Sequence, residues 1–140
     1  MRADISTVII CDDVRKELSG KDILIGVYSG TVNVPAYPTT FPAAFWIEIE
    51  PEGAGSIHCE FTIATPSGNP PMKVGFDLDV VEAGTAVFVM GGVPLTLERD
   101  GDIVISAKIG NADETVVKRK SVKRVPLAAS TPGQPAAFSS

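Results

Sequence analysis

Three charged residues that follow an apolar run are the first candidates for chemistry. Asp12, Asp13 and Arg15 come directly after Val8–Cys11, and nowhere else in the 140 residues do several ionisable side chains crowd so closely against an apolar stretch. Neighbouring carboxylates are suited to binding a cation or forming a recognition surface. Alternatively, Asp13 and Arg15 share a face of an extended segment and form a structural ion pair, because a part-buried carboxylate needs such a partner. We favour the ion pair.

Other aspartate pairs offer little to a metal ion. Calcium takes six to eight oxygens that converge from loops. Asp77 and Asp79 alternate along the polar face of a predicted strand, and Asp100–Asp102 fits a hairpin turn. We therefore expect no metal and no cofactor. A domain that binds a small ligand or a cation through Asp12, Asp13 and Arg15 stays open as the alternative function.

Catalytic motifs are missing from the sequence. His58 is the single histidine, and alternation along a strand points it away from its neighbour Cys59. The sequence contains no G-x-S-x-G elbow and no phosphate-binding G-x-x-x-x-G-K loop. Both cysteines, Cys11 and Cys59, lie in apolar runs and are expected to be buried thiols. We predict that the protein is not an enzyme.

A basic run near the C-terminus contrasts with an acidic remainder. Residues 1–117 carry 17 acids and 7 bases, a balance of −10, whereas residues 118–124 add five bases. Lys118, Arg119 and Lys120 could contact an acidic surface or a nucleic acid. No aromatic residues interleave with them, and the acidic remainder would repel phosphate. We favour a sheet edge that its lysines protect against edge-to-edge pairing, and nucleic acid is not the expected partner.

Trp46 is the one tryptophan, and it falls on the nominally polar face of its segment with Glu48 and Glu50. An exposed tryptophan can anchor a protein interface. The proline-rich linker before it or the C-terminal tail could equally cover it. The candidate binding residues are thus Asp12, Asp13, Arg15, Trp46, Lys118, Arg119 and Lys120.

The elements that would position the first candidates form a predicted hairpin. Val8–Cys11 and Ile23–Tyr28 are apolar, and Ser19-Gly20-Lys21 between them is a turn signal, so we expect two buried strands. The segment from Asp12 to Ser19 is either an extended arm, which we favour, or a short helical turn. A two-residue turn would place Glu17 opposite Asp22, a like-charge pair, so a longer turn is expected.

Clean alternation of apolar and polar residues predicts most of the remaining strands. The apolar positions are Phe45, Ile47 and Ile49 in the first segment, Ile57, Cys59, Phe61 and Ile63 in the second, and Met72, Val74, Phe76, Leu78 and Val80 in the third. Pro35, Pro38 and Pro42 exclude a helix or a central strand around them. Gly91-Gly92 is expected to end a strand, and Asp100-Gly101 to join two strands as a tight hairpin.

These segments predict an all-β domain. Eight or nine short antiparallel strands, each apolar on one face, are typical of two sheets packed as a β-sandwich of the immunoglobulin-like or C2-like kind, without a substantial helix. An open barrel is the lesser alternative. Residues 1–125 form the single domain, and residues 126–140 are a low-complexity tail too poor in apolar residues to fold alone.

The N-terminal third resembles a known signature. Cys11 to Arg15, Gly20-Lys21, Leu24 to Tyr28 and the Val-Pro linker from Val34 to Pro42 are similar to the start of an uncharacterised family of small bacterial and phage-associated proteins. The resemblance covers about the first 42 residues. It implies a β-sandwich-like domain and no catalytic activity.

Composition places the protein in a broad class. Neither a signal peptide nor a membrane-spanning run is present, so a cytoplasmic location is expected. With no catalytic motif, a polarised charge distribution and Trp46 on a polar face, we expect a non-enzymatic interaction or structural module. Its partner would be another protein or a second copy, with a small ligand as the lesser possibility.

Overall fold

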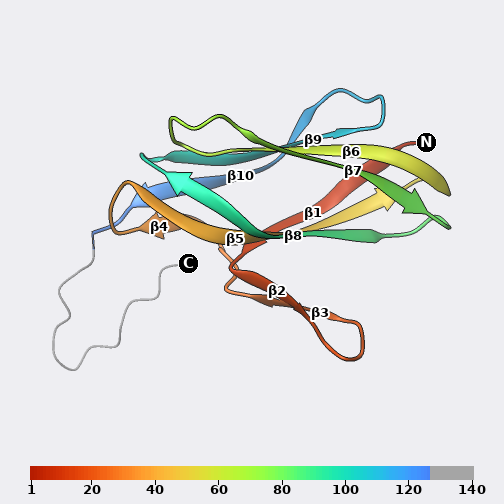
Figure 1. The fold of residues 1–140 in the computed structure, drawn as a ribbon, viewed down its shortest axis with the longest axis horizontal. Helices are drawn as coiled ribbons and strands as arrows, with labels where there is room; N and C mark the ends of the chain where they lie inside the picture. Colours follow the sequence, from red (N-terminus) through yellow and green to blue (C-terminus); the bar gives the residue numbers. More distant parts are fainter. Residues whose placement is uncertain (127–140) are drawn as a thin grey trace.

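A computed structural model describes residues 1–126 of the chain. Ten strands and no helix are found in that range (Figure 1). They are β1 (Ala3–Cys11), β2 (Asp13–Lys16), β3 (Asp22–Ile25), β4 (Val32–Val34), β5 (Thr39–Pro51), β6 (Gly55–Ala64), β7 (Met72–Val80), β8 (Ala86–Leu97), β9 (Gly101–Ile109) and β10 (Thr115–Arg124). Of the predicted tail, residues 126–140, only residue 126 is among the described residues.

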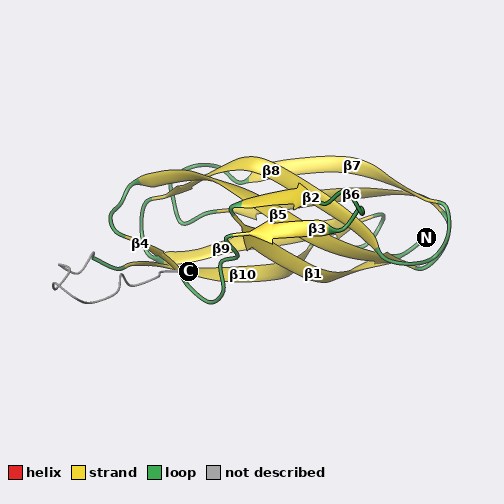
Figure 2. Cartoon of the chain, turned by 90° about the horizontal axis from the view of Figure 1, so that it is seen from below, coloured by secondary structure: helices red, strands yellow, loops and turns green. Residues whose placement is uncertain are grey.

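Two sheets face each other across one apolar core. A three-stranded sheet has the order β1-β5-β8, and a five-stranded sheet has the order β4-β10-β9-β6-β7 (Figures 1 and 2). The predicted inward residues of β5 and β6 are all buried, which confirms the alternation there. The all-β, two-sheet class is therefore confirmed. One pair departs from the antiparallel expectation, because β4 pairs with β10 in parallel.

Stacked aromatic rings close one side of the core. Phe76 of β7 and Phe88 of β8 stack with their ring centroids 3.8 Å apart, and Phe61 of β6 lies 5.9 and 6.1 Å from them. These rings connect the border strand of one sheet to the border strand of the other. The apolar face of β7 is only half buried along its length, since β7 has a single neighbour in its sheet.

Pro42 corrects the expectation that prolines exclude a central strand. It lies in β5, the middle strand of the three-stranded sheet, opposite Pro94 of β8. Pairing between β1 and β5 ends at Ala44, however, so β5 has only one partner at Pro42. Proline has no amide proton, but on the side of β1 there is no strand at this position whose hydrogen bond could be lost.

Gly91-Gly92 does not end a strand, contrary to prediction. β8 continues through both glycines, and the register with β5 shifts between Ala43 and Phe45. Gly92 has a φ of +63°, a conformation that glycine adopts without strain. The glycine pair is a β-bulge inside a long strand.

Asp100-Gly101 is likewise not a tight hairpin, because β8 and β9 belong to different sheets. The Asp100 carboxylate accepts bonds from Tyr37 Oη at 2.6 Å and from the Arg124 amide at 2.9 Å. These bonds lower the pKa of Asp100, while burial and the bond to Asp100 raise the pKa of Tyr37 to about 12. The dipeptide thus forms a corner that connects the two sheets.

Candidate functional site

The β2–β3 hairpin projects from the outer face of the three-stranded sheet (Figure 1). Asp13 pairs with Ile25 and Lys16 with Asp22, so the connecting loop is longer than two residues, as expected. Val8–Cys11 is not part of the hairpin. It belongs to β1 and pairs with β5, because Val8 and Ile10 are part of the core between the sheets.

The outer face of the hairpin corrects the prediction of two buried strands. Ile23, Ile25 and Val27 are 42–43% exposed, and Leu18 in the loop is fully exposed. A ribbon of two four-residue strands can bury only the face turned toward the sheet.

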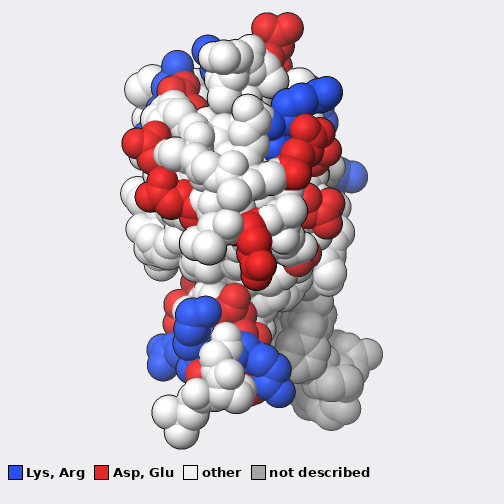
Figure 3. Space-filling model, turned by 90° about the vertical axis from the view of Figure 1, so that its right-hand side faces the viewer, with Lys and Arg blue, Asp and Glu red and all other residues white. Residues whose placement is uncertain are grey.

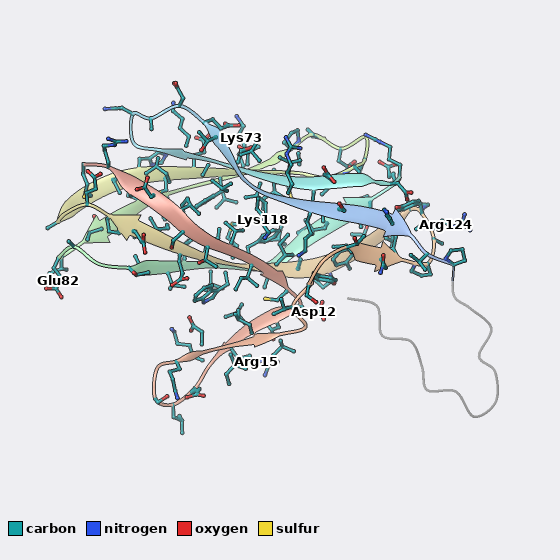
Figure 4. The ribbon with its side chains drawn as sticks, turned by 180° about the vertical axis from the view of Figure 1, so that it is seen from behind. Asp12, Arg15, Lys73, Glu82, Lys118 and Arg124 are labelled. Atoms are coloured by element: carbon teal, nitrogen blue, oxygen red, sulfur yellow. The ribbon has the colours of Figure 1, made fainter. Side chains whose placement is uncertain are left out.

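The base of the hairpin is fixed by a compact set of bonds. The Asp12 amide donates to the carbonyls of Ile25 and Gly26, and the Tyr28 amide donates to Ile10. Tyr28 Oη donates to Asp12 Oδ1 at 2.9 Å. Burial, and then this bond, raise the pKa of Tyr28. Gly26 has a φ of +67°, and a Cβ there would overlap the Asp12 carboxylate. Asp12 is thus a structural part of the junction (Figure 4).

Asp13 and Arg15 form the expected ion pair. Arg15 Nε lies 2.9 Å from Asp13 Oδ2, and the Val14 amide donates to the other carboxylate oxygen. These bonds lower the pKa of Asp13. The side chains of Arg15 and Asp13 are 70% and 48% exposed, so the pair lies at the surface of the hairpin and compensates no buried charge.

Trp46 is hydrogen-bonded to the hairpin. The sequence suggested the proline-rich linker or the C-terminal tail as the segment that covers Trp46, and not the hairpin. Its indole Nε1 donates to Asp22 Oδ2 at 2.9 Å, and Lys16 Nζ lies 2.9 Å from the other oxygen. The Asp22 side chain is only 15% exposed, and these two donors lower its pKa. Asp22 was not among the predicted site residues. The one signal in the sequence was a tryptophan on a polar strand face, which indicates that something covers it.

The basic residues lie elsewhere. Lys118, Arg119 and Lys120 are in β10, and Figure 4 shows Lys118 in the body of the sandwich, away from Arg15 on the hairpin. Arg119 lies 3.8 Å from Asp102. Burial, and then Lys118, lower the pKa of Lys120. Because β4 covers only Val122–Arg124, most of the outer edge of β10 has no partner strand among residues 1–126, and protection of this edge by its lysines stays a prediction.

The remaining candidates do not converge on a chemical centre. His58 is paired with Asp77 at 2.8 Å on an exposed face, and Cys11 and Cys59 are free and buried. Within residues 1–126, no three side chains of the metal-binding types gather into a ligand set. Asp12 and Asp13 each hold a different partner. The same residues contain no helix that could cross a membrane.

Charge is distributed differently on the hairpin and on the sandwich. Basic and acidic side chains alternate on the hairpin, whereas acidic side chains predominate over the adjoining end of the sandwich (Figure 3). On the hairpin each base has an acid beside it. The pairs are Arg15–Asp13, Lys16–Asp22 and Lys21–Glu17. The hairpin therefore presents no excess of positive charge.

Comparison with known proteins assigns the family. A model of a family of unknown function, DUF6941, matches residues 6–119, a segment that contains the strands from β2 to β9 completely and parts of β1 and β10. No curated protein matches the sequence. The chain belongs to the DUF6941 family.

Proposed function

We propose that this member of the DUF6941 family is a protein-interaction module whose contact element is the β2–β3 hairpin. The observation that carries the proposal is a set of exposed aliphatic side chains on the hairpin, namely Ile23 and Ile25 on one face of β3 and Leu18 in the loop, with Val27 just beyond the strand. These side chains remain accessible although every described segment is in place. Apolar side chains left exposed together on an ordered element are typical of interaction sites.

The hairpin is well suited to present such a surface. It is held at its base by Asp12, Gly26 and Tyr28, and against the sheet by the bond between Asp22 and Trp46. An element that is already ordered loses little conformational entropy when it binds. The anchoring residues thus support binding indirectly, by fixing the orientation of the aliphatic side chains.

The chemistry of the hairpin favours a protein partner. Phosphate backbones are bound by unpaired basic side chains, and each basic side chain of the hairpin already has a carboxylate beside it. The partner surface that fits best is an apolar cleft with a polar rim, which would receive Leu18 and the isoleucines while the Arg15–Asp13 pair stays at the margin.

Affinity capture with matched variants tests the proposal. The variant Leu18→Ser/Ile23→Thr removes apolar contact area without changing charge, and Val116→Thr is the control, since Val116 is similarly exposed but lies on β10. We expect proteins captured by the wild type and by the control to be lost with the double variant. Identical captured sets for all three proteins would overturn the assignment of the hairpin.

The alternative of a small-ligand or cation site at Asp12, Asp13 and Arg15 gains no supporting observation, because each carboxylate already holds a donor. A thermal-shift series with calcium, manganese and common metabolites is expected to leave the melting temperature unchanged. A rise that depends on ligand concentration would revive this alternative, since binding to the native state raises stability by mass action.

Origin and location belong to the same proposal. The N-terminal signature supports a bacterial or phage-associated protein, and two free, buried thiols are compatible with a reducing compartment such as the cytoplasm. Genes next to those of family members provide the test. Neighbours that encode phage components or bacterial assemblies are expected, and family members confined to genomes without either would contradict it.

A further inference from the structure

The border strand β8 differs from the other long border strands of the two sheets in having no charged side chain. Ala86–Leu97 contains only apolar residues, two glycines, a proline and a threonine. By contrast, β1 carries Asp4, and β7 carries Lys73, Asp77 and Asp79. Proteins normally protect exposed sheet edges with charges, prolines or bulges. β8 has its bulge and its proline only in the second half, at Gly91-Gly92 and Pro94.

The first half of β8 is therefore an unprotected edge. Ala86–Met90 pairs with β5 on one side, and no other described strand pairs with it on the other. Its side chains are fixed, because Phe88 stacks on Phe76 against the core, and Val87 and Val89 are left 43% and 39% exposed. An ordered edge of this kind can accept one more antiparallel strand.

We infer that Ala86–Met90 pairs with the same segment of a second copy of this chain. In an antiparallel pair related by a two-fold axis at Phe88, Val87 of one copy lies opposite Val89 of the other, and Ala86 lies opposite Met90. Each residue of a symmetric pair meets its own segment, so a strand with charges of one sign would bring like charges together, which is destabilising. Because β8 carries no charge, two copies of it can pair without bringing like charges together.

The length of the free edge sets the strength of this dimer. Pairing stops at the β7–β8 loop on one side and at the Gly91-Gly92 bulge on the other, which leaves only Ala86–Met90 in each copy. An interface of this size, with two exposed valines from each copy, is well below the ~1,600 Å² of a typical stable complex. We therefore expect a weak, concentration-dependent dimer.

This inference goes beyond the proposed function, because it uses the backbone edge of β8 in place of the exposed side chains of the hairpin, and a different partner. The hairpin contributes no strand to the paired edge, although β2 packs close to β8, and Leu18 and Ile23 belong to the loop and to β3. The variant Leu18→Ser/Ile23→Thr should therefore dimerise like the wild type, even though it loses its captured partners. Failure of one proposal is thus distinguishable from failure of the other.

Sedimentation velocity of the full chain from about 5 to about 500 μM, a range in which weak self-association becomes visible, tests the dimer. We expect Val87→Lys and Val89→Glu, each alone, to weaken self-association at least tenfold, because an outward charge at an edge opposes pairing without touching the core. Val116→Lys, a change of the same type at a similarly exposed site on β10, should dimerise like the wild type.

Mixing two variants tests the register. In the pairing centred on Phe88, the ammonium group introduced by Val87→Lys in one copy would face the carboxylate introduced by Val89→Glu in the other. An equimolar mixture of the two variants should therefore recover dimers that contain one copy of each. A mixture that stays monomeric would overturn this register. A wild type that is monomeric at the highest concentration, or variants that associate as strongly as the wild type, would overturn the inference itself.

Discussion

At the scale of single residues, the density of charges after β1 is explained by geometry rather than by reactivity. Asp12 binds the Tyr28 hydroxyl, Asp13 binds Arg15, and Asp22 binds both Trp46 and Lys16. Their contributions differ. The Asp12 and Asp22 bonds connect the hairpin to the sandwich, whereas the Asp13–Arg15 pair is local and exposed.

Replacement of Tyr28 by phenylalanine tests the junction. The change removes one bond to Asp12 but keeps the ring packed against Phe41, at a centroid distance of 5.8 Å. We expect a loss of about 0.5–1.5 kcal/mol in the free energy of unfolding, measured by urea denaturation. Arg15→Ala is the comparison and should leave the unfolding midpoint nearly unchanged, since exposed ion pairs contribute little. Equal losses of stability in the two variants would contradict the view that the Asp12–Tyr28 bond stabilises the junction whereas the Asp13–Arg15 pair does not.

Gly26 provides a second test of the same junction. Gly26→Ala combines a left-handed backbone with a Cβ that overlaps the Asp12 carboxylate, whereas Gly20→Ala has the left-handed backbone alone, since nothing lies within 4 Å of its Cβ. We expect a cost of about 1 kcal/mol for Gly20→Ala and at least ~1 kcal/mol more for Gly26→Ala, by the same denaturation measurement. Equal costs would mean that Asp12 moves away freely.

At the scale of elements, the bond between Trp46 and Asp22 decides whether the hairpin rests on the sheet. Trp46 is the only tryptophan, so its fluorescence reports this contact directly. We expect Asp22→Ala to shift the emission to longer wavelength and to lower the melting temperature modestly, because the bonds to Trp46 and Lys16 are lost while the core of the sandwich, which does not include Asp22, stays intact. Unchanged emission would show that the hairpin is held without this bond.

The pH dependence of stability follows from the same contacts. The folded-state pKa values of Asp13, Asp22 and Asp100 are all lowered, so the unfolded chain binds more protons than the folded chain around pH 4. Their stabilisation is present above the unfolded pKa and is lost as the pH falls through the folded pKa. We expect the melting temperature to fall from about pH 4 downward, with a shallower fall for Asp22→Asn. If the melting temperatures of the wild type and of Asp22→Asn fell in parallel with pH, Asp22 would not contribute to the pH dependence of stability.

Some elements were predictable from the sequence and others were not, for physical reasons. Alternation identified β5, β6 and β7 because each buries one face, a local property of the strand. Glycine and proline signals were misleading at Pro42, Gly91-Gly92 and Asp100-Gly101, because their effect depends on which neighbour each strand has in the sheet. A hairpin was predicted, but its first strand was placed wrongly, since β1 and β2 are separated only by Asp12, where the chain leaves the sheet.

At the scale of the whole molecule, residues 1–126 form a two-sheet sandwich with one arm attached to its outer face and one short, uncharged sheet edge, Ala86–Met90, on which no other described strand pairs. The ion pair in the opening motif was predictable because Asp13 and Arg15 are neighbours in sequence. The contact of Asp22 with Trp46 was not, because it joins residues 24 positions apart through the docking of the hairpin. The exposed aliphatic side chains of the hairpin became visible only once the hairpin was seen to lie outside the core.

The central claim is that the hairpin contacts another protein, and photo-crosslinking from its tip tests this most directly. A photoreactive amino acid replaces Leu18 in one protein and the solvent-facing Val116 in another, and both are irradiated in cells that carry the native gene. We predict a discrete crosslinked partner from position 18 that is missing from position 116. The same products from both positions, or none from position 18, would contradict the account.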